Sequence, residues 1–238
     1  MTQDDIRLRL QVIRKRMAQA AERVGRDPSD IALLAASKQV GLETILRAID
    51  SGIEHVGENQ VQEAEAKFKD SEPAQRPFTL QLIGSLQANK VRRALQLFSV
   101  IQSVDTLSLA RRMNNIAREL DRQVPVYIQV NVGSEPTKSG VKPDQLIELA
   151  GSVAECENLG LTGLMAVPPD LADPEAVRPY FRMLRELRDS LYRIEPFHDS
   201  SLGLSMGMSH DFEVAIEEGA TMVRLGRVIW EGAPLDTP

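Results

Sequence analysis

Hydrophobic positions near the amino terminus recur at intervals of three and four residues. They are Ile6, Leu10, Ile13, Met17, Ala20 and Val24. This spacing predicts an amphipathic helix, and Gly25 and Pro28 mark its end. The apolar run that follows, IALLAAS at residues 31–37, does not alternate with polar positions. Such a run is typical of a strand in a parallel sheet that is covered by helices on both faces.

Seven further short apolar runs bring the number of strand candidates to eight. The later ones span residues 53–56, 80–83, 99–104, 126–130, 161–167, 202–206 and 222–225. Helical spacing lies between them, most clearly in the stripe Val177, Tyr180, Phe181, Leu184, Leu187 and Leu191. Other helices are expected to begin near Leu42, Val61, Ala88, Thr106, Pro143 and Phe212.

The strict alternation of strands and helices predicts a parallel sheet, and eight such units in about 250 residues make a TIM barrel. We therefore expect an α/β fold with a single (β/α)8 barrel and an extra N-terminal helix. The alternative is a doubly wound open sheet, which usually has a GxGxxG turn after its first strand; this chain has SKQV at 37–40. No Pro/Gly/Ser-rich linker divides residues 1–238, so one domain is expected, with a flexible loop at 134–143.

Composition and charge exclude several classes of protein. Hydrophobic residues are 42% and charged residues 26% of the 238, which is ordinary for a globular protein. The net charge of -6 argues against nucleic acid or an anionic membrane as the main partner. A single cysteine, Cys156, permits no internal disulfide, and three scattered histidines offer little material for a metal site. Because the first residues lack a secretory signal, we expect a cytoplasmic protein.

A barrel places functional side chains just past the carboxyl ends of its strands. Polar and glycine residues do follow the predicted strands: Lys38, Glu58, Asn59, Ser85, Gln87, Ser103, Asp105, Asn131, Ser205, Gly207, Ser209 and Gly226. Loops after strands are generally rich in such residues, but Lys38 ends a wholly apolar strand. Its amine either reaches solvent or lies desolvated at the barrel mouth, where it could form a Schiff base.

The loops after the last two strands suggest a phosphorylated ligand. In TIM barrels these loops commonly bind phosphate through backbone N–H groups. Here they carry LSMGMSHD at 204–211 and MVRLGR at 222–227. Met206 and Met208 could equally fill gaps in the core, and Arg224 and Arg227 could equally form surface ion pairs.

With these motifs assembled, the chain resembles the pyridoxal phosphate homeostasis protein family of the alanine-racemase-like barrel class. The resemblance runs from the first helix to Gly232. The matching stretches are ASK (36–38), VGEN (56–59) with QE (62–63), IGSLQ (83–87) with NK (89–90), SVD (103–105), QVN (129–131), GLMAVPP (163–169), LSMGMS (204–209) with Asp211, and VRLG (223–226). Eight ordered matches are far more specific than any one alone.

The resemblance implies a barrel that holds pyridoxal 5'-phosphate (PLP) as an aldimine on Lys38. By the same carry-over, Ser209, Gly226 and Arg227 would bind the phosphate. Asn59 would lie near the ring hydroxyl, and Ser205 and Met206 near the ring or the phosphate. Arg224 would face the pyridine nitrogen. Because arginine keeps its proton, it would leave that nitrogen unprotonated and weaken the cofactor as an electron sink.

The chain departs from the family pattern at four positions. Gln60 stands where an aromatic residue is frequent, and Gln81 or its neighbour where a histidine is frequent. His210 replaces an acidic or small residue. Arg227 replaces threonine or serine, which weakens the expectation of a side-chain contact with the phosphate there.

The function expected from the resemblance is a cytoplasmic PLP carrier or buffer in PLP homeostasis. Its partners would be the cofactor and, transiently, PLP-dependent apo-enzymes, with no nucleic acid, no membrane and no metal, and the chain would act as a monomer. The alternative is a weak racemase or decarboxylase. Racemases of this class add a β-rich domain with a second acid/base, which leaves Lys38 as the clear proton carrier here. A Schiff-base aldolase is a third alternative, although its lysine more commonly lies on a mid-barrel strand.

Overall fold

The computed structural model describes residues 1–69, 77–135 and 138–231 of the 238. Eight parallel strands close into a barrel in the order β1 to β8, and β1 pairs with β8 through Ala32 and Met222. The strands are β1 Ala32–Ala36, β2 His55–Glu58, β3 Thr79–Leu82, β4 Val100–Val104, β5 Val124–Gln129, β6 Leu159–Met165, β7 Gly203–Ser205 and β8 Met222–Leu225. All eight predicted strands are confirmed, and the closure excludes the doubly wound alternative.

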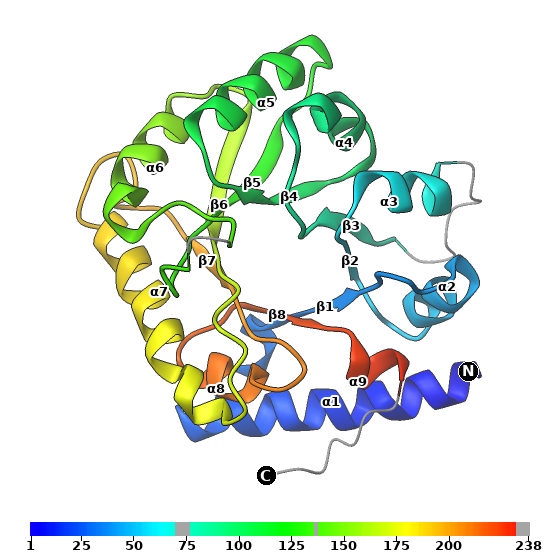
Figure 1. Ribbon diagram of the computed structural model, residues 1–238. Coiled ribbons are helices and arrows are strands. Elements are labelled where there is room, and N and C mark those ends of the chain that lie inside the picture. Colours follow the sequence, from blue (N-terminus) through cyan, green and yellow to red (C-terminus); the bar gives the residue numbers. More distant parts are fainter. Residues whose placement is uncertain (70–76, 136–137, 232–238) are drawn as a thin grey trace.

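Helices surround the barrel (Figure 1). They are α1 Gln3–Arg23, α2 Leu42–Asp50, α3 Val61–Phe68, α4 Val91–Leu97, α5 Leu107–Glu119, α6 Leu146–Ala154, α7 Arg178–Leu191, α8 Phe212–Glu217 and α9 Arg227–Trp230. Short 3-10 turns η1 Pro28–Asp30, η2 Ala88–Lys90, η3 Pro143–Gln145 and η4 Pro174–Val177 complete the described elements. The starts predicted near Ala88 and Pro143 are 3-10 turns that lead into α4 and α6.

Helix α1 is the predicted N-terminal addition to the barrel. It begins with a capping box between Thr2 and Asp5 and ends before Gly25, whose φ of 68° suits glycine. It lies along α8 and α9 on the outside of the barrel (Figure 1). The predicted apolar face is buried except at Val24, which caps the helix and is 45% exposed. That one assignment was wrong because the helix ends at Arg23.

The strands divide their side chains between two sides of the barrel wall. In β1, Leu33 and Ala35 belong to the apolar core between strands and helices. Leu34 points to the other side and lies against Gly57, since a Cβ on Gly57 would collide with the Leu34 side chain. This alternation is the period of two expected of a strand. Past the end of β1, Ser37 is buried and its Oγ donates to Gly57 O at 3.2 Å, and Lys38 is exposed.

Candidate functional site

Lys38 lies in a tight turn directly after β1. The turn is closed by a hydrogen bond from Val40 N to Ser37 O of 3.0 Å, and Gln39 adopts a left-handed backbone with φ of 62°. The Lys38 side chain is exposed. Of the two sequence-based alternatives, the structure therefore has the solvent-facing amine, and the desolvated one is wrong. The reason is that β1 ends at Ala36 and the turn carries the lysine beyond the rim of the barrel.

A partly buried ionic cluster lies behind this turn. The ammonium of Lys67 on α3 donates 2.8 Å hydrogen bonds to Ser37 O, Glu58 Oε1 and Glu63 Oε1. Ser37 Oγ donates to the same Glu58 oxygen at 2.6 Å. Glu63 Oε1 also accepts from Gln39 N at 2.6 Å. We call Glu58, Glu63 and Lys67 the Lys67 cluster.

The two carboxylates of the Lys67 cluster differ in their pKa values. Burial raises the pKa of Glu58 against the opposing hydrogen bonds from Lys67 and Ser37. Its Oε2 atom is buried and has no hydrogen-bond partner in the part of the chain that the structure describes. For Glu63 burial acts in the same direction, but the bonds from Lys67 and Gln39 outweigh it and lower its pKa. Glu58 is therefore the less compensated charge.

The β8 side of the mouth brings Ser209 and Gly226 together. Gly226 N donates to Ser209 Oγ at 3.4 Å. Gly226 lies against β1, since a Cβ on it would be 3.3 Å from Ala36 O. Trp230 donates its indole N–H to the same Ala36 carbonyl at 2.7 Å. These contacts place the predicted phosphate-binding pair beside the strand that carries Lys38.

Arg224 lies inside the barrel, so the alternative of a surface ion pair is wrong. Nη1 donates to Ser205 O at 2.5 Å and to Ser205 Oγ at 2.9 Å, and Nη2 donates to Ala166 O at 2.8 Å. Burial lowers the pKa of Arg224 to about 10, although Asp211 opposes this. It forms no salt bridge with any residue that the structure describes. A buried guanidinium without an ion-pair partner can accommodate an acceptor or an anion.

A hydrogen-bond chain supports Arg224 from within the barrel. Ser205 Oγ donates to Gln102 Oε1 at 2.6 Å, and Gln102 Nε2 donates to Gln81 Oε1 at 2.6 Å. Gln81 in turn lies 3.3 Å from the Nδ1 atom of His55. Sequence reasoning missed Gln102. The available signal was a buried glutamine in the middle of the apolar strand β4, because a polar group at such a position needs partners.

Asn59 is placed by the close approach of the next loop. It is half-buried at the end of β2, and a Cβ on Gly84 would collide with its carbonyl oxygen. Ile83 N donates to Glu58 O at 2.9 Å just before this contact. Only glycine allows the two backbones to lie this close.

Met206 and Arg227 make no contact in the described residues that tests their predicted roles. The side chain of Met206 is fully buried in the apolar core, which agrees with core packing. Arg227 is exposed at the start of α9, and His210 is exposed with Nε2 2.8 Å from Ala172 O. A ring contact of Met206 and a phosphate contact of Arg227 stay predictions.

The loop expected at 134–143 is held by β5 and by Asn131 just after it, on both sides of residues 136–137, which lie outside the described residues. Asn131 Nδ2 donates to Glu135 O at 2.8 Å and to Lys138 O at 3.2 Å. Val141 N donates to Gln129 O at 2.8 Å. The role of Asn131 here is thus to hold a loop.

Comparisons with known proteins identify the family. The model of the alanine racemase N-terminal domain matches residues 8–234. The pyridoxal phosphate homeostasis protein of Aquifex aeolicus is 44% identical over 224 residues, which is 93% of this chain and 96% of the relative. That of Pseudomonas aeruginosa is 38% identical over 226 residues, 94% of each chain. This chain belongs to the pyridoxal phosphate homeostasis protein family.

Solved structures agree with this family and with its fold. PipY of Synechococcus elongatus, solved with PLP bound, has a TM-score of 0.80 and 32% identity, covering 94% of this chain and 99% of that one. D-threonine aldolase from Filomicrobium marinum, at 16% identity and a TM-score of 0.73, shares the fold alone, and this chain covers 60% of it. The predicted resemblance and the predicted barrel are confirmed.

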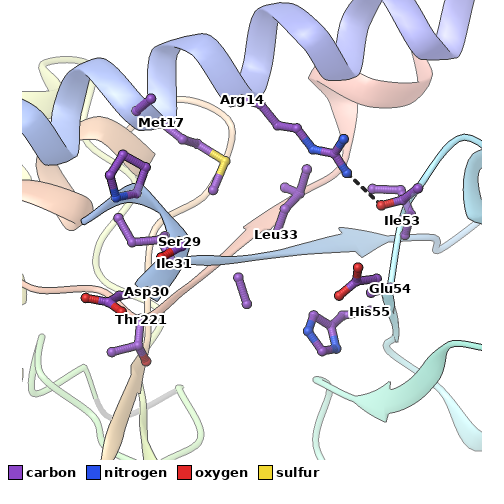
Figure 2. A pocket seen from close by; sticks show the side chains of 14 residues that line it. Arg14, Met17, Ser29, Asp30, Ile31, Leu33, Ile53, Glu54, His55 and Thr221 are labelled. Carbon is purple, nitrogen blue, oxygen red and sulfur yellow. Dashed lines mark hydrogen bonds between the residues drawn. The ribbon is translucent and has the colours of Figure 1, made fainter. Parts of the chain in front are cut away.

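In this member of the homeostasis protein family, a cavity of about 520 Å³ lies at the opposite end of the barrel. Figure 2 shows it between α1 and the amino ends of β1 and β2. Arg14 reaches from α1 to Gly52 O at 2.6 Å, and His55 lines the far side. None of the predicted site residues lines this cavity, so it is separate from the mouth.

Proposed function

We propose that this chain binds PLP at the barrel mouth and takes part in intracellular PLP homeostasis as a carrier or buffer. When bound, PLP supplies a reactive aldehyde and an anionic phosphate. The amine of Lys38 would add to the aldehyde carbon, and water would leave as the C=N bond of a Schiff base forms. The names of the relatives and the PLP-bound PipY structure support the ligand.

The residues at the mouth fit this ligand. Lys38 offers an exposed amine, and Arg224 offers a buried guanidinium without a carboxylate partner in the described ranges. Ser209 Oγ and Gly226 N offer a hydroxyl and a backbone amide for phosphate. The observation that carries the proposal is the pairing of β1 with β8, which joins these groups at adjacent strand ends.

The surroundings of Arg224 favour holding the cofactor over converting a substrate. Its guanidinium is fixed by Ser205 and Ala166 and stays protonated at neutral pH with a pKa of about 10. Facing the pyridine nitrogen, it would supply no proton to the ring, and an unprotonated ring withdraws electrons weakly. We propose no racemase or decarboxylase activity for this arrangement.

An exposed Lys38 also suits reversible exchange. Water and an acceptor protein can reach the amine, so the Schiff base can hydrolyse and release the cofactor. We propose delivery to PLP-dependent apo-enzymes by a monomer in the cytoplasm. No helix in the described ranges is long and apolar enough to cross a membrane.

Titration of the purified protein with PLP tests the proposal. We expect visible Schiff-base absorbance with wild type and with Lys15→Ala, a control at an exposed lysine of α1. Lys38→Ala is expected to lose it while unfolding at the same denaturant concentration. An equal, borohydride-reducible adduct in Lys38→Ala would refute the role of Lys38. Turnover of any amino acid well above the rate with free PLP would favour the enzymatic alternative.

A further inference from the structure

The turn that carries Lys38 is strained and is held from α3. Gln39, the third residue of the turn, has φ of 62°, a conformation that glycine or asparagine usually supplies. A glutamine persists there only when its surroundings fix the backbone. The surroundings on this side are Glu63, which accepts from Gln39 N at 2.6 Å, and Lys67, which donates to Ser37 O at 2.8 Å.

From these contacts we infer that Lys67 is a positioning residue for the Schiff-base lysine. With Glu58 and Glu63 it fixes the backbone on both sides of Lys38 and so limits the positions that the amine can reach. The inference rests on the proposed function, because it assigns a second lysine to the same site. Lys67 itself is not a candidate for the reaction, since its ammonium is occupied by Ser37, Glu58 and Glu63.

The backbone around Lys38 is held at three points. Trp230 binds Ala36 O from the β8 side, Lys67 binds Ser37 O, and Glu63 binds Gln39 N. Lys38 is exposed between these points. A lysine has many rotamers, and a fixed Cα limits the positions that its amine can sample.

The Lys67 cluster is built for this purpose more than for general stability. The Lys67 side chain is 13% exposed and Glu58 is fully buried, so both were desolvated. One ammonium serves two carboxylates, and Glu58 Oε2 has no hydrogen-bond partner in the described part of the chain. Buried ion pairs of this kind contribute little net stability. What they do provide is a fixed geometry at the turn.

Binding of two ligands distinguishes a misplaced Lys38 from a pocket that no longer folds correctly. PLP needs both the pocket and the amine of Lys38, whereas pyridoxine 5'-phosphate has an alcohol in place of the aldehyde and needs only the pocket. In Lys67→Met we expect Schiff-base formation with PLP to slow about 10-fold or more, since misplacing a reacting group costs 10-fold to 100-fold. Binding of pyridoxine 5'-phosphate is expected to change less than about 2-fold. Lys67→Arg, which keeps the donor, is expected to restore much of the rate.

Two further variants complete the test. Glu63→Ala removes only the contact with Gln39 N and one partner of Lys67, and we expect a smaller slowing in the same direction. Should Lys67→Met not fold, this variant decides. Glu65→Gln, on the same helix, breaks an ion pair with Arg93 that does not touch the turn, and it is expected to behave as wild type.

The outcomes distinguish the inference from the proposed function. If wild type forms no Schiff base on Lys38, the proposed function fails. If wild type forms it and neither Lys67→Met nor Glu63→Ala slows it, the positioning role fails while the proposed function stands. Equal weakening of PLP and pyridoxine 5'-phosphate would also overturn positioning, because it would show damage to the whole pocket.

Discussion

Two buried acidic side chains in different parts of this barrel differ in how their charge is compensated. Glu58, behind the Lys38 turn, shares one ammonium with Glu63, and burial raises its pKa. Glu218, at the end of α8, forms ion pairs with Arg178, Arg182 and Arg185, all from α7. Burial acts against its charge too, but the bonds from Arg182 and Arg178 outweigh it and lower its pKa.

The difference teaches what each region is for. The α7–α8 side has an excess of arginines, which compensates a buried carboxylate and joins α7 to the end of α8. The β1–β3 rim, by which we mean the turns after β1, β2 and β3, uses one lysine and close backbone contacts. The backbone at Lys38 and Asn59 is held in a fixed position there, while the charge of Glu58 is less well compensated. Functional sites are where such local disadvantages are retained.

The largest effect is expected from crowding the rim. In Gly84→Ala the new Cβ would collide with the carbonyl oxygen of Asn59, so we expect a loss of about 3 kcal/mol in the free energy of unfolding and weakened PLP binding. Gly160→Ala is the matched control, because its Cβ would meet nothing within 4 Å. Urea unfolding and PLP titration measure both. Equal stability of the two variants would show that the close approach at Asn59 is not needed.

A matched pair of glutamine substitutions compares the two carboxylates directly. Glu218→Gln removes a charge that several arginines need, and we expect about 1.5 kcal/mol of destabilisation at pH 7. Glu58→Gln removes a charge that burial disfavours and keeps an acceptor for Ser37 and Lys67, so we expect a loss below about 1 kcal/mol. Denaturant unfolding at pH 7 gives both values. The reverse ranking would contradict the comparison.

The smallest effects lie in the pH dependence, where the two variants should diverge in sign. The pKa of Glu218 is lowered below 4.5, so its stabilisation is present above that pH and is lost on acidification through the folded-state pKa. The pKa of Glu58 is raised above 4.5, so the folded protein takes up a proton first as the pH falls from 7.

Relative to each variant, wild type should therefore lose stability on acidification in the first case and gain it in the second. We expect each change to be smaller than the loss of stability in Gly84→Ala. Unfolding of wild type and both variants from pH 7 to well below the ordinary glutamate pKa measures these differences. Parallel curves for Glu58→Gln and Glu218→Gln would remove the distinction between the two regions.

Most of the fold was predictable from sequence because parallel strands buried on both faces are continuous apolar runs. Boundaries were less certain: Ile53 was placed in a strand, yet β2 begins at His55 and Ile53 is buried before it. A buried side chain looks the same in a strand and in the loop before it. Periodicity therefore gave the number and order of strands more securely than their ends.

The candidate site was predictable where neighbours follow from strand order. Ser205 with Arg224 and Ser209 with Gly226 lie on or after adjacent strands, and the structure brings each pair together. The contacts of Lys67 were not predictable, because a lysine on an amphipathic helix has many possible partners. The exposure of Lys38 depended on where β1 ends, which an apolar run does not specify.

The most direct measurement is the location of the covalent bond to PLP. Wild-type protein is loaded with PLP, reduced with borohydride, digested and mapped by mass spectrometry. We predict one phosphopyridoxyl group per chain, on Lys38. A group on any other lysine, or no covalent group at saturating PLP, would contradict the central claim.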